Sequence, residues 1–180
     1  MIFKRFLKAK PEEDLAWTLY KGIVEQARQP ALFSNLGIPD DVDGRFESIV
    51  LHLVLVLRRL KKDFPEGEAL AASLQEVFYT DMDRSLREMG AGDLGVGKRV
   101  QRMAEGFMGR LNAYGDALDS LAQGGEVDLK AALQRNVYGT LPADSVDPEG
   151  LLRYAISLAD ALDRQDGVEL RRGMLEFLSP

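Results

Sequence analysis

The segment "GRFESIVLHLVLVLRRLKK", residues 44–62, decides the fold of this 180-residue chain. Its middle part, residues 49–57, is apolar at every position except His52, so a helix formed there has no polar face. The β-branched residues would also suit a strand, but the segment continues into a cationic end, which favours a helix C-terminus. Nine apolar residues are too few to span a bilayer, which requires about 20 residues of helix. We therefore expect a central buried helix.

The segments on both sides of residues 44–62 carry apolar residues at helical spacing, and no segment has the alternation of a strand. We expect further helices at about residues 11–29, 67–89, 100–121, 128–139 and 149–165, a short helical turn after Pro30, and a last amphipathic piece at 168–178. We expect Asp43 to cap the helix at residues 44–62 and Asp128 to cap the helix at residues 128–139. Gly124–Gly125 should end the long helix at residues 100–121. These patterns predict an all-α fold, a single-domain bundle of about six or seven helices over residues 11–180.

Composition excludes several kinds of site. The chain has no cysteine and one histidine, so disulfides, thiolate zinc sites, thiol nucleophiles and multi-histidine metal sites are excluded. A net charge of −6 argues against general nucleic-acid binding. The charge is uneven, with six basic and three acidic residues at 84–110 but four basic and eleven acidic residues at 115–170. This asymmetry indicates opposed faces with different partners.

The first ten residues, "MIFKRFLKAK", form a basic amphipathic N-terminal segment without any acid. No apolar core of a secretory signal follows it. One interpretation is a short helix on a membrane surface, and the other is a first helix that packs on the domain. Both interpretations stay open. The candidate membrane-surface contacts are Phe3, Lys4, Arg5, Phe6 and Lys8.

The stretch "GDLGVGKR", residues 92–99, matches seven of the eight positions of a phosphate-binding loop. The eighth position is Arg99, which cannot ligate Mg²⁺ as the usual Ser or Thr does. The residues before it have helical periodicity, whereas a phosphate-binding loop follows a strand. We interpret the stretch as a glycine connection between two helices, in which Gly90 ends the first helix. Nucleotide binding is not expected.

Charged side chains crowd around this glycine-rich corner, in "DMDRSLREMGAGDLGVGKRVQRM", residues 81–103. Ion pairs are the simplest interpretation, because Asp83 reaches Arg87 and Arg84 reaches Glu88 across one helical turn. The functional interpretation is a docking corner for a partner. His52 in the apolar helix is expected to be a core or interface histidine with a hydrogen-bonded ring, and it joins the candidates. The candidate client-binding residues are Asp81, Asp83, Arg84, Arg87, Glu88, Asp93, Lys98, Arg99, Arg102 and His52.

Three segments resemble a known family. They are "DGRFESIVLHLVLVLRRLK" (43–61), "DMDRSLREMGAGDLGVGKRVQRMAEGF" (81–107), and "YGDAL" (114–118) followed by "ALQRNVYG" (132–139). On these residues the chain resembles the ubiquinol–cytochrome c chaperone family, assembly factors for respiratory complex III, from about residue 32 to 139. It resembles the bacterial members, and we expect it to lack the presequence and the membrane-anchoring extension of the mitochondrial ones.

The resemblance implies a non-catalytic, all-helical assembly chaperone without a cofactor. It implies binding of newly made cytochrome b, in mitochondria together with a small partner protein. We accordingly expect a cytoplasmic protein that touches the cytoplasmic face of the bacterial inner membrane, with no nucleic-acid partner and no small-molecule substrate. The alternative is a helical domain that binds a nucleotide or a quinone. A quinone site would need a cavity lined by residues such as Leu53, Phe78 and Phe107.

Overall fold

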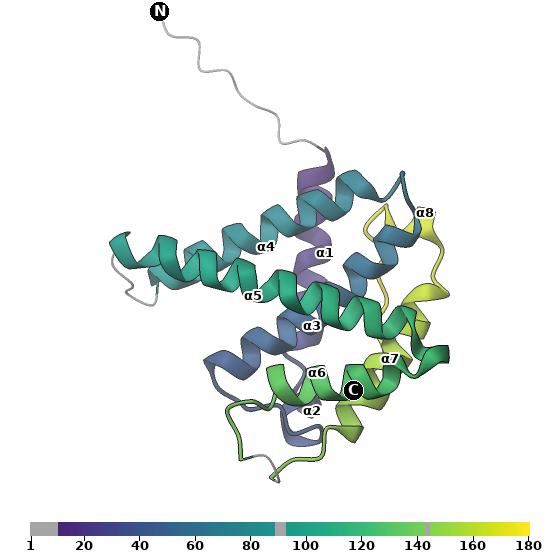
Figure 1. The fold of residues 1–180 in the computed structure, drawn as a ribbon. Coiled ribbons are helices and arrows are strands. Elements are labelled where there is room, and N and C mark those ends of the chain that lie inside the picture. Colours follow the sequence, from purple (N-terminus) through teal and green to yellow (C-terminus); the bar gives the residue numbers. More distant parts are fainter. Residues whose placement is uncertain (1–10, 89–92, 143–144) are drawn as a thin grey trace, which may run out of the picture.

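The computed structural model describes residues 11–88, 93–142 and 145–180, which form an all-α bundle without any strand among them (Figure 1). This confirms the predicted fold class. The described residues form eight α-helices, of which α2 and α8 are only five and four residues long. The elements are α1 (Pro11–Ala27), α2 (Pro30–Ser34), α3 (Val42–Lys62), α4 (Glu68–Glu88), α5 (Asp93–Asp119), the 3₁₀ turn η1 (Leu121–Gln123), α6 (Gly125–Asn136), α7 (Glu149–Asp163) and α8 (Gly167–Leu170).

Helix α3 is the central buried helix that the sequence predicts. Every side chain from Glu47 to Leu57 is buried, and α1, α4, α5 and α7 all pack against α3. The apolar segment is therefore the core of the fold. Of the helices in the described residues, none combines the length and the hydropathy needed to cross a bilayer.

The N-terminus of α3 is capped by Asp41, so the prediction of Asp43 as the cap is wrong. The Asp41 carboxylate accepts a hydrogen bond of 2.8 Å from the backbone N–H of Gly44, and Asp43 lies inside the first turn. The preceding chain folds so close that a Cβ at Gly44 would lie 2.0 Å from the carbonyl oxygen of Pro39. Glycine is required there, because any side chain would clash with that backbone.

Helices α4 and α5 form a V that is narrow where α4 ends and α5 begins (Figure 1), and residues 89–92 between them lie outside the described residues. Helix α5 begins at Asp93 and not near Val100, so Gly95 and Gly97 are helical and do not belong to the turn. That part of the predicted connection is wrong. A helical glycine costs only about 1 kcal/mol, too little to stop a helix of 27 residues that starts with a favourable acid. Helical residues also cannot form the loop that cradles a phosphate.

Two predicted boundaries near the C-terminus differ from the structure. Helix α5 ends at Asp119, Gly124 adopts a left-handed φ of 98°, and α6 already begins at Gly125. Asp128 therefore lies in the first turn of α6 and does not cap it. The amphipathic piece at 168–178 is helical only as far as Leu170, and the tail that follows has no regular structure.

Candidate docking surface

The charges at the end of α4 are largely neutralised by one another. The Arg84 guanidinium lies 2.6 Å from the Asp81 carboxylate and 4.0 Å from Glu88, and Arg87 lies 2.7 Å from Asp83. Asp81 also accepts a hydrogen bond of 3.0 Å from the Tyr20 hydroxyl on α1. These contacts confirm the predicted ion pairs within the helix. Exposed pairs of this kind contribute only about 0–1 kcal/mol.

The cations on the first half of α5 are arranged differently. Lys98, Arg99 and Arg102 are exposed, and none forms an ion pair with a carboxylate of the described residues. Arg102 makes only a long hydrogen bond of 3.4 Å to the Lys98 carbonyl oxygen. Asp93, the remaining candidate at the corner, is the first residue of α5. The α5 cations are thus available to a partner.

Arg99 and Arg102 line a surface groove of about 650 Å³ between the start of α3, the end of α4, the first half of α5 and the end of α6. We call it the arginine-lined groove. A third cation, Arg135, lies across it on α6, is exposed, and has no ion pair among the described residues. Its apolar lining includes Val42, Phe46, Leu86, Met103 and Val137. The groove therefore combines apolar surface with unpaired positive charge.

An ion pair between the buried Glu47 and the half-buried Arg110 joins α3 to α5 in this groove. The Arg110 Nε lies 2.6 Å from a Glu47 carboxylate oxygen, Nη2 contacts the other oxygen, and Nη1 donates to the Gly106 carbonyl at 2.9 Å. Burial raises the pKa of Glu47 above its ordinary value, while the Arg110 guanidinium acts in the opposite direction. Such a bidentate pair fixes the relative position of two helices. Glu47 and Arg110 are 63 residues apart, and no pattern in the sequence indicates that they pair.

His52 lies in the core and belongs to a buried polar network rather than to the surface. Its Nδ1 is 2.7 Å from the Ser48 carbonyl oxygen, and its Nε2 is 2.8 Å from the Tyr154 hydroxyl. A carbonyl only accepts, so Nδ1 carries the proton and Nε2 accepts from Tyr154. The Gln26 side-chain amide donates to the Tyr154 hydroxyl at 2.8 Å and to the Leu178 carbonyl at 2.6 Å. The network therefore joins α1, α3, α7 and the C-terminal tail.

The burial of His52 predicts acid sensitivity. Burial lowers its pKa from 6.5 to about 4, so between pH 7 and 5 the unfolded chain binds a proton that the folded chain does not. Stability should fall with pH in this window, by about 2 kcal/mol at this site. Urea unfolding at pH 7 and pH 5 measures the loss. His52→Gln should remove that part of the pH dependence, and equal pH dependence in the two proteins would contradict the assignment.

The cationic end of α3 is mostly engaged inside the protein. Arg58 lies 2.7 Å from Asp119 and 3.0 Å from Asp163, and Lys62 also pairs with Asp163. The buried Arg59 donates to two backbone carbonyls and to the Asp63 carboxylate. This end therefore serves the packing of α3 against its neighbours.

Two further sets of predicted residues are the lining of an apolar ligand site and the membrane-surface contacts. Leu53, Phe78 and Phe107 are fully buried, and the rings of Phe78 and Phe107 pack with their centroids 5.0 Å apart. They fill the core. The membrane-surface candidates Phe3, Lys4, Arg5, Phe6 and Lys8 lie outside the described residues.

Comparisons with known proteins extend the resemblance. The family model described as ubiquinol-cytochrome C chaperone matches residues 34–177, well beyond residue 139. The ubiquinol-cytochrome c reductase complex assembly factor 1 proteins of Xenopus laevis, Mus musculus and Homo sapiens are 24% identical over 155 residues, 86% of this chain. The chain spans 76% of the Xenopus protein and about half of the mouse and human proteins, 51% and 50%.

A solved structure agrees with these relatives. The crystal structure of the Cbp3 homolog from Brucella abortus is 35% identical, with a TM-score of 0.80 over 93% of this chain and 91% of that chain. The curated relatives are named as assembly factors, which are not enzymes, and the chain is accordingly non-catalytic. With a family model that covers most of its length, the protein belongs to the ubiquinol–cytochrome c chaperone family, the assembly factors of complex III.

Proposed function

We propose that this protein binds newly made cytochrome b and supports its entry into complex III, and that the client docks in the arginine-lined groove. The observation that carries the proposal is the groove itself, which joins apolar surface from α3, α4, α5 and Val137 to unpaired Arg99, Arg102 and Arg135. All of these residues fall within the stretch that matches the family model.

The chemistry of the groove suits a segment of a membrane protein before it is assembled. Such a segment presents apolar side chains that need cover outside the bilayer, and Val42, 65% exposed, offers apolar contact. The arginines would attract carboxylates or carbonyl oxygens near the ends of the segment and would speed the encounter. Charges at the rim of an interface raise the association rate more than they raise the affinity. A chaperone that holds its client only transiently requires this combination.

The proposal includes a transient contact with the membrane surface on the cytoplasmic side, where a client such as cytochrome b is inserted. The basic N-terminal segment supports this, because cations near an anionic membrane contribute about 1 kcal/mol each. A small partner protein, as implied for the mitochondrial relatives, is also part of the proposal.

Reversal of two charges tests the docking surface. Lys98→Glu with Arg99→Glu should leave the melting temperature nearly unchanged, because both side chains are exposed and have no ion pair among the described residues. The same variant should lose crosslinking to cytochrome b and should accumulate little complex III. The measurements are thermal unfolding, crosslinking in cells and native gel analysis of complex III.

A matched control separates the docking surface from net charge. Lys21→Glu with Arg164→Glu makes the same change in charge at two exposed positions on α1 and just after α7, away from the groove. This control should assemble complex III normally. If the Lys98 and Arg99 variant stays folded and also assembles complex III normally, the client docks elsewhere.

A further inference from the structure

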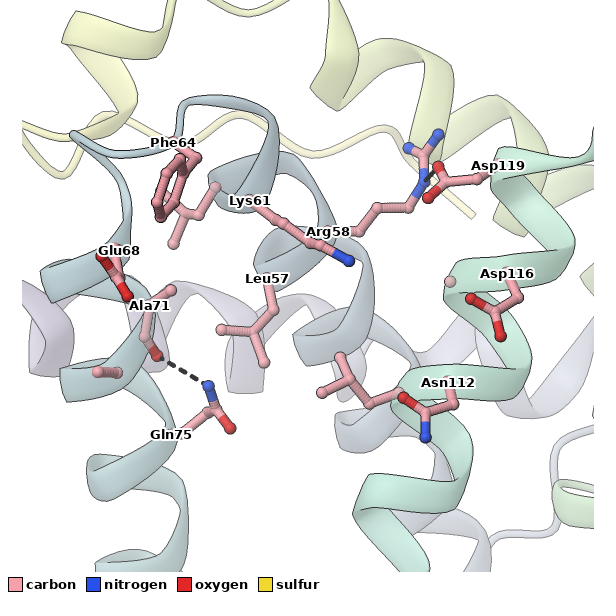
Figure 2. Close-up of a pocket in the computed structure, with 14 residues that line it drawn as sticks. Leu57, Arg58, Lys61, Phe64, Glu68, Ala71, Gln75, Asn112, Asp116 and Asp119 are labelled. Atoms are coloured by element: carbon pink, nitrogen blue, oxygen red, sulfur yellow. Dashed lines mark hydrogen bonds and ion pairs between the residues drawn. The ribbon is translucent and has the colours of Figure 1, made fainter.

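A second surface groove, of about 440 Å³, lies at the wide end of the V formed by α4 and α5 (Figure 2). Leu57 and Leu60 of α3 form its floor, Ala71 belongs to one wall on α4, and Leu111 belongs to the other wall on α5. We call it the α4/α5 groove. Ala72 and Gly115 also line it, and such small residues allow a bound segment to approach the helices closely.

The walls of the α4/α5 groove carry carboxylates that are open to a ligand. Glu68 on α4 and Asp116 on α5 are exposed, and neither forms an ion pair with a described residue. Arg58 is held by Asp119 and Asp163 and cannot neutralise them. Lys61 is the one opposing charge left at the groove among the described residues. The groove therefore fits an apolar segment that carries positive charge.

The chain itself contains a segment with this chemistry. Residues 1–10 carry four cations and no acid, interleaved with Ile2, Phe3, Phe6 and Leu7. This composition complements an apolar groove with a carboxylate on each wall. The arginine-lined groove, by contrast, has the same sign of charge as this segment and would repel it.

The α4/α5 groove is also within reach of the segment. Helix α1 begins at Pro11, and Leu15 of its second turn lies against Gly173. Two residues before Gly173, Arg171 lies 2.7 Å from Asp63, the neighbour of the groove residue Phe64. The start of α1 and the mouth of the groove thus lie at the same end of the molecule. Ten extended residues reach up to about 35 Å.

We propose that residues 1–10 dock in the α4/α5 groove of their own chain, and that an anionic membrane competes with the groove for them. Phe64, 68% exposed at the edge of the groove, is the apolar contact that the segment would cover.

Spin labels on the full chain test this proposal, because the protein has no cysteine of its own. One label is attached at Lys4→Cys and the other at Asn112→Cys, an exposed position on the α5 wall. Double electron–electron resonance should show a short-distance peak. Vesicles of phosphatidylcholine with phosphatidylglycerol should abolish the peak, and vesicles of phosphatidylcholine alone should leave it.

Groove variants decide whether the peak reports docking. Glu68→Lys with Asp116→Lys should abolish it, and Ala72→Trp, which fills the groove without a charge change, should do the same. The matched control is Glu126→Lys with Asp128→Lys on α6, which should keep it. A broad distribution of label-to-label distances in the protein without groove substitutions would overturn the proposal. A short-distance peak that survives both groove variants would also overturn it. A peak that vanishes on dilution with unlabelled protein would place the segment on a second copy and would equally overturn docking within one chain.

Discussion

Leu53→Asp is expected to unfold the protein or to drive it into aggregates. Leu53 is fully buried in the middle of α3, the helix on which α1, α4, α5 and α7 all pack. A carboxylate there would lose its hydration without a partner, at a cost of several kcal/mol, and the lost leucine contacts would add to it. Domains are stable by only about 5–15 kcal/mol, so this one substitution should remove most of the stability.

Circular dichroism and size-exclusion chromatography measure the outcome. Val42→Asp is the matched control, because it places the same carboxylate in the same helix at a position that is 65% exposed. An acid in the first turn of a helix is favourable, so this control should keep its melting temperature. A monodisperse Leu53→Asp protein with an unchanged melting temperature would show that residues 49–57 do not form the core.

Arg59→Met should destabilise the protein by about 3 kcal/mol, because a buried hydrogen-bonded charge leaves several groups unpaired when it is removed. The guanidinium donates to the Leu162 carbonyl at 3.0 Å, to the Gln165 carbonyl at 2.8 Å and to the Asp63 carboxylate at 2.7 Å. Methionine keeps most of the aliphatic stem, so the loss reports mainly the polar contacts. Urea unfolding at pH 7 gives the free energy of unfolding.

Arg45→Met is the control for this experiment, since Arg45 is also on α3 but pairs with Asp40 in an exposed position. Its loss should stay below about 1 kcal/mol. Equal losses in the two variants would mean that the contacts of Arg59 do not anchor the C-terminal end of α3 to the end of α7.

The fold could be predicted from the sequence because the dominant signal is local. The apolar residues at 49–57 leave α3 no polar face, and the stripes on α1, α4, α5 and α7 repeat within single helices. The errors fall at helix ends, where a capping residue contributes only about 1 kcal/mol. Asp41 and Asp43 are equally good caps in composition, and the structure shows that Asp41 accepts from the Gly44 N–H where the chain at Pro39 packs close to Gly44.

The candidate site could be predicted only in part, because much of it depends on contacts between distant residues. Lys98, Arg99 and Arg102 lie within five residues of sequence, so the sequence alone identifies them as a cationic cluster. Glu47 and Arg110 meet across 63 positions, and His52 and Tyr154 across 102. Arg135 joins the arginine-lined groove from α6 only through the packing of α6 on α5. No periodicity or motif reports such pairs.

Photocrosslinking in cells tests most directly whether cytochrome b docks in the arginine-lined groove. Benzoylphenylalanine in place of Val42, an exposed residue of that groove, is compared with the same group in place of Val168, 48% exposed on α8. The proposal predicts an adduct with newly made cytochrome b from position 42 and none from position 168, with the adduct identified by mass spectrometry. A cytochrome b adduct from position 168 alone, or none from position 42 while complex III assembles normally, would contradict it.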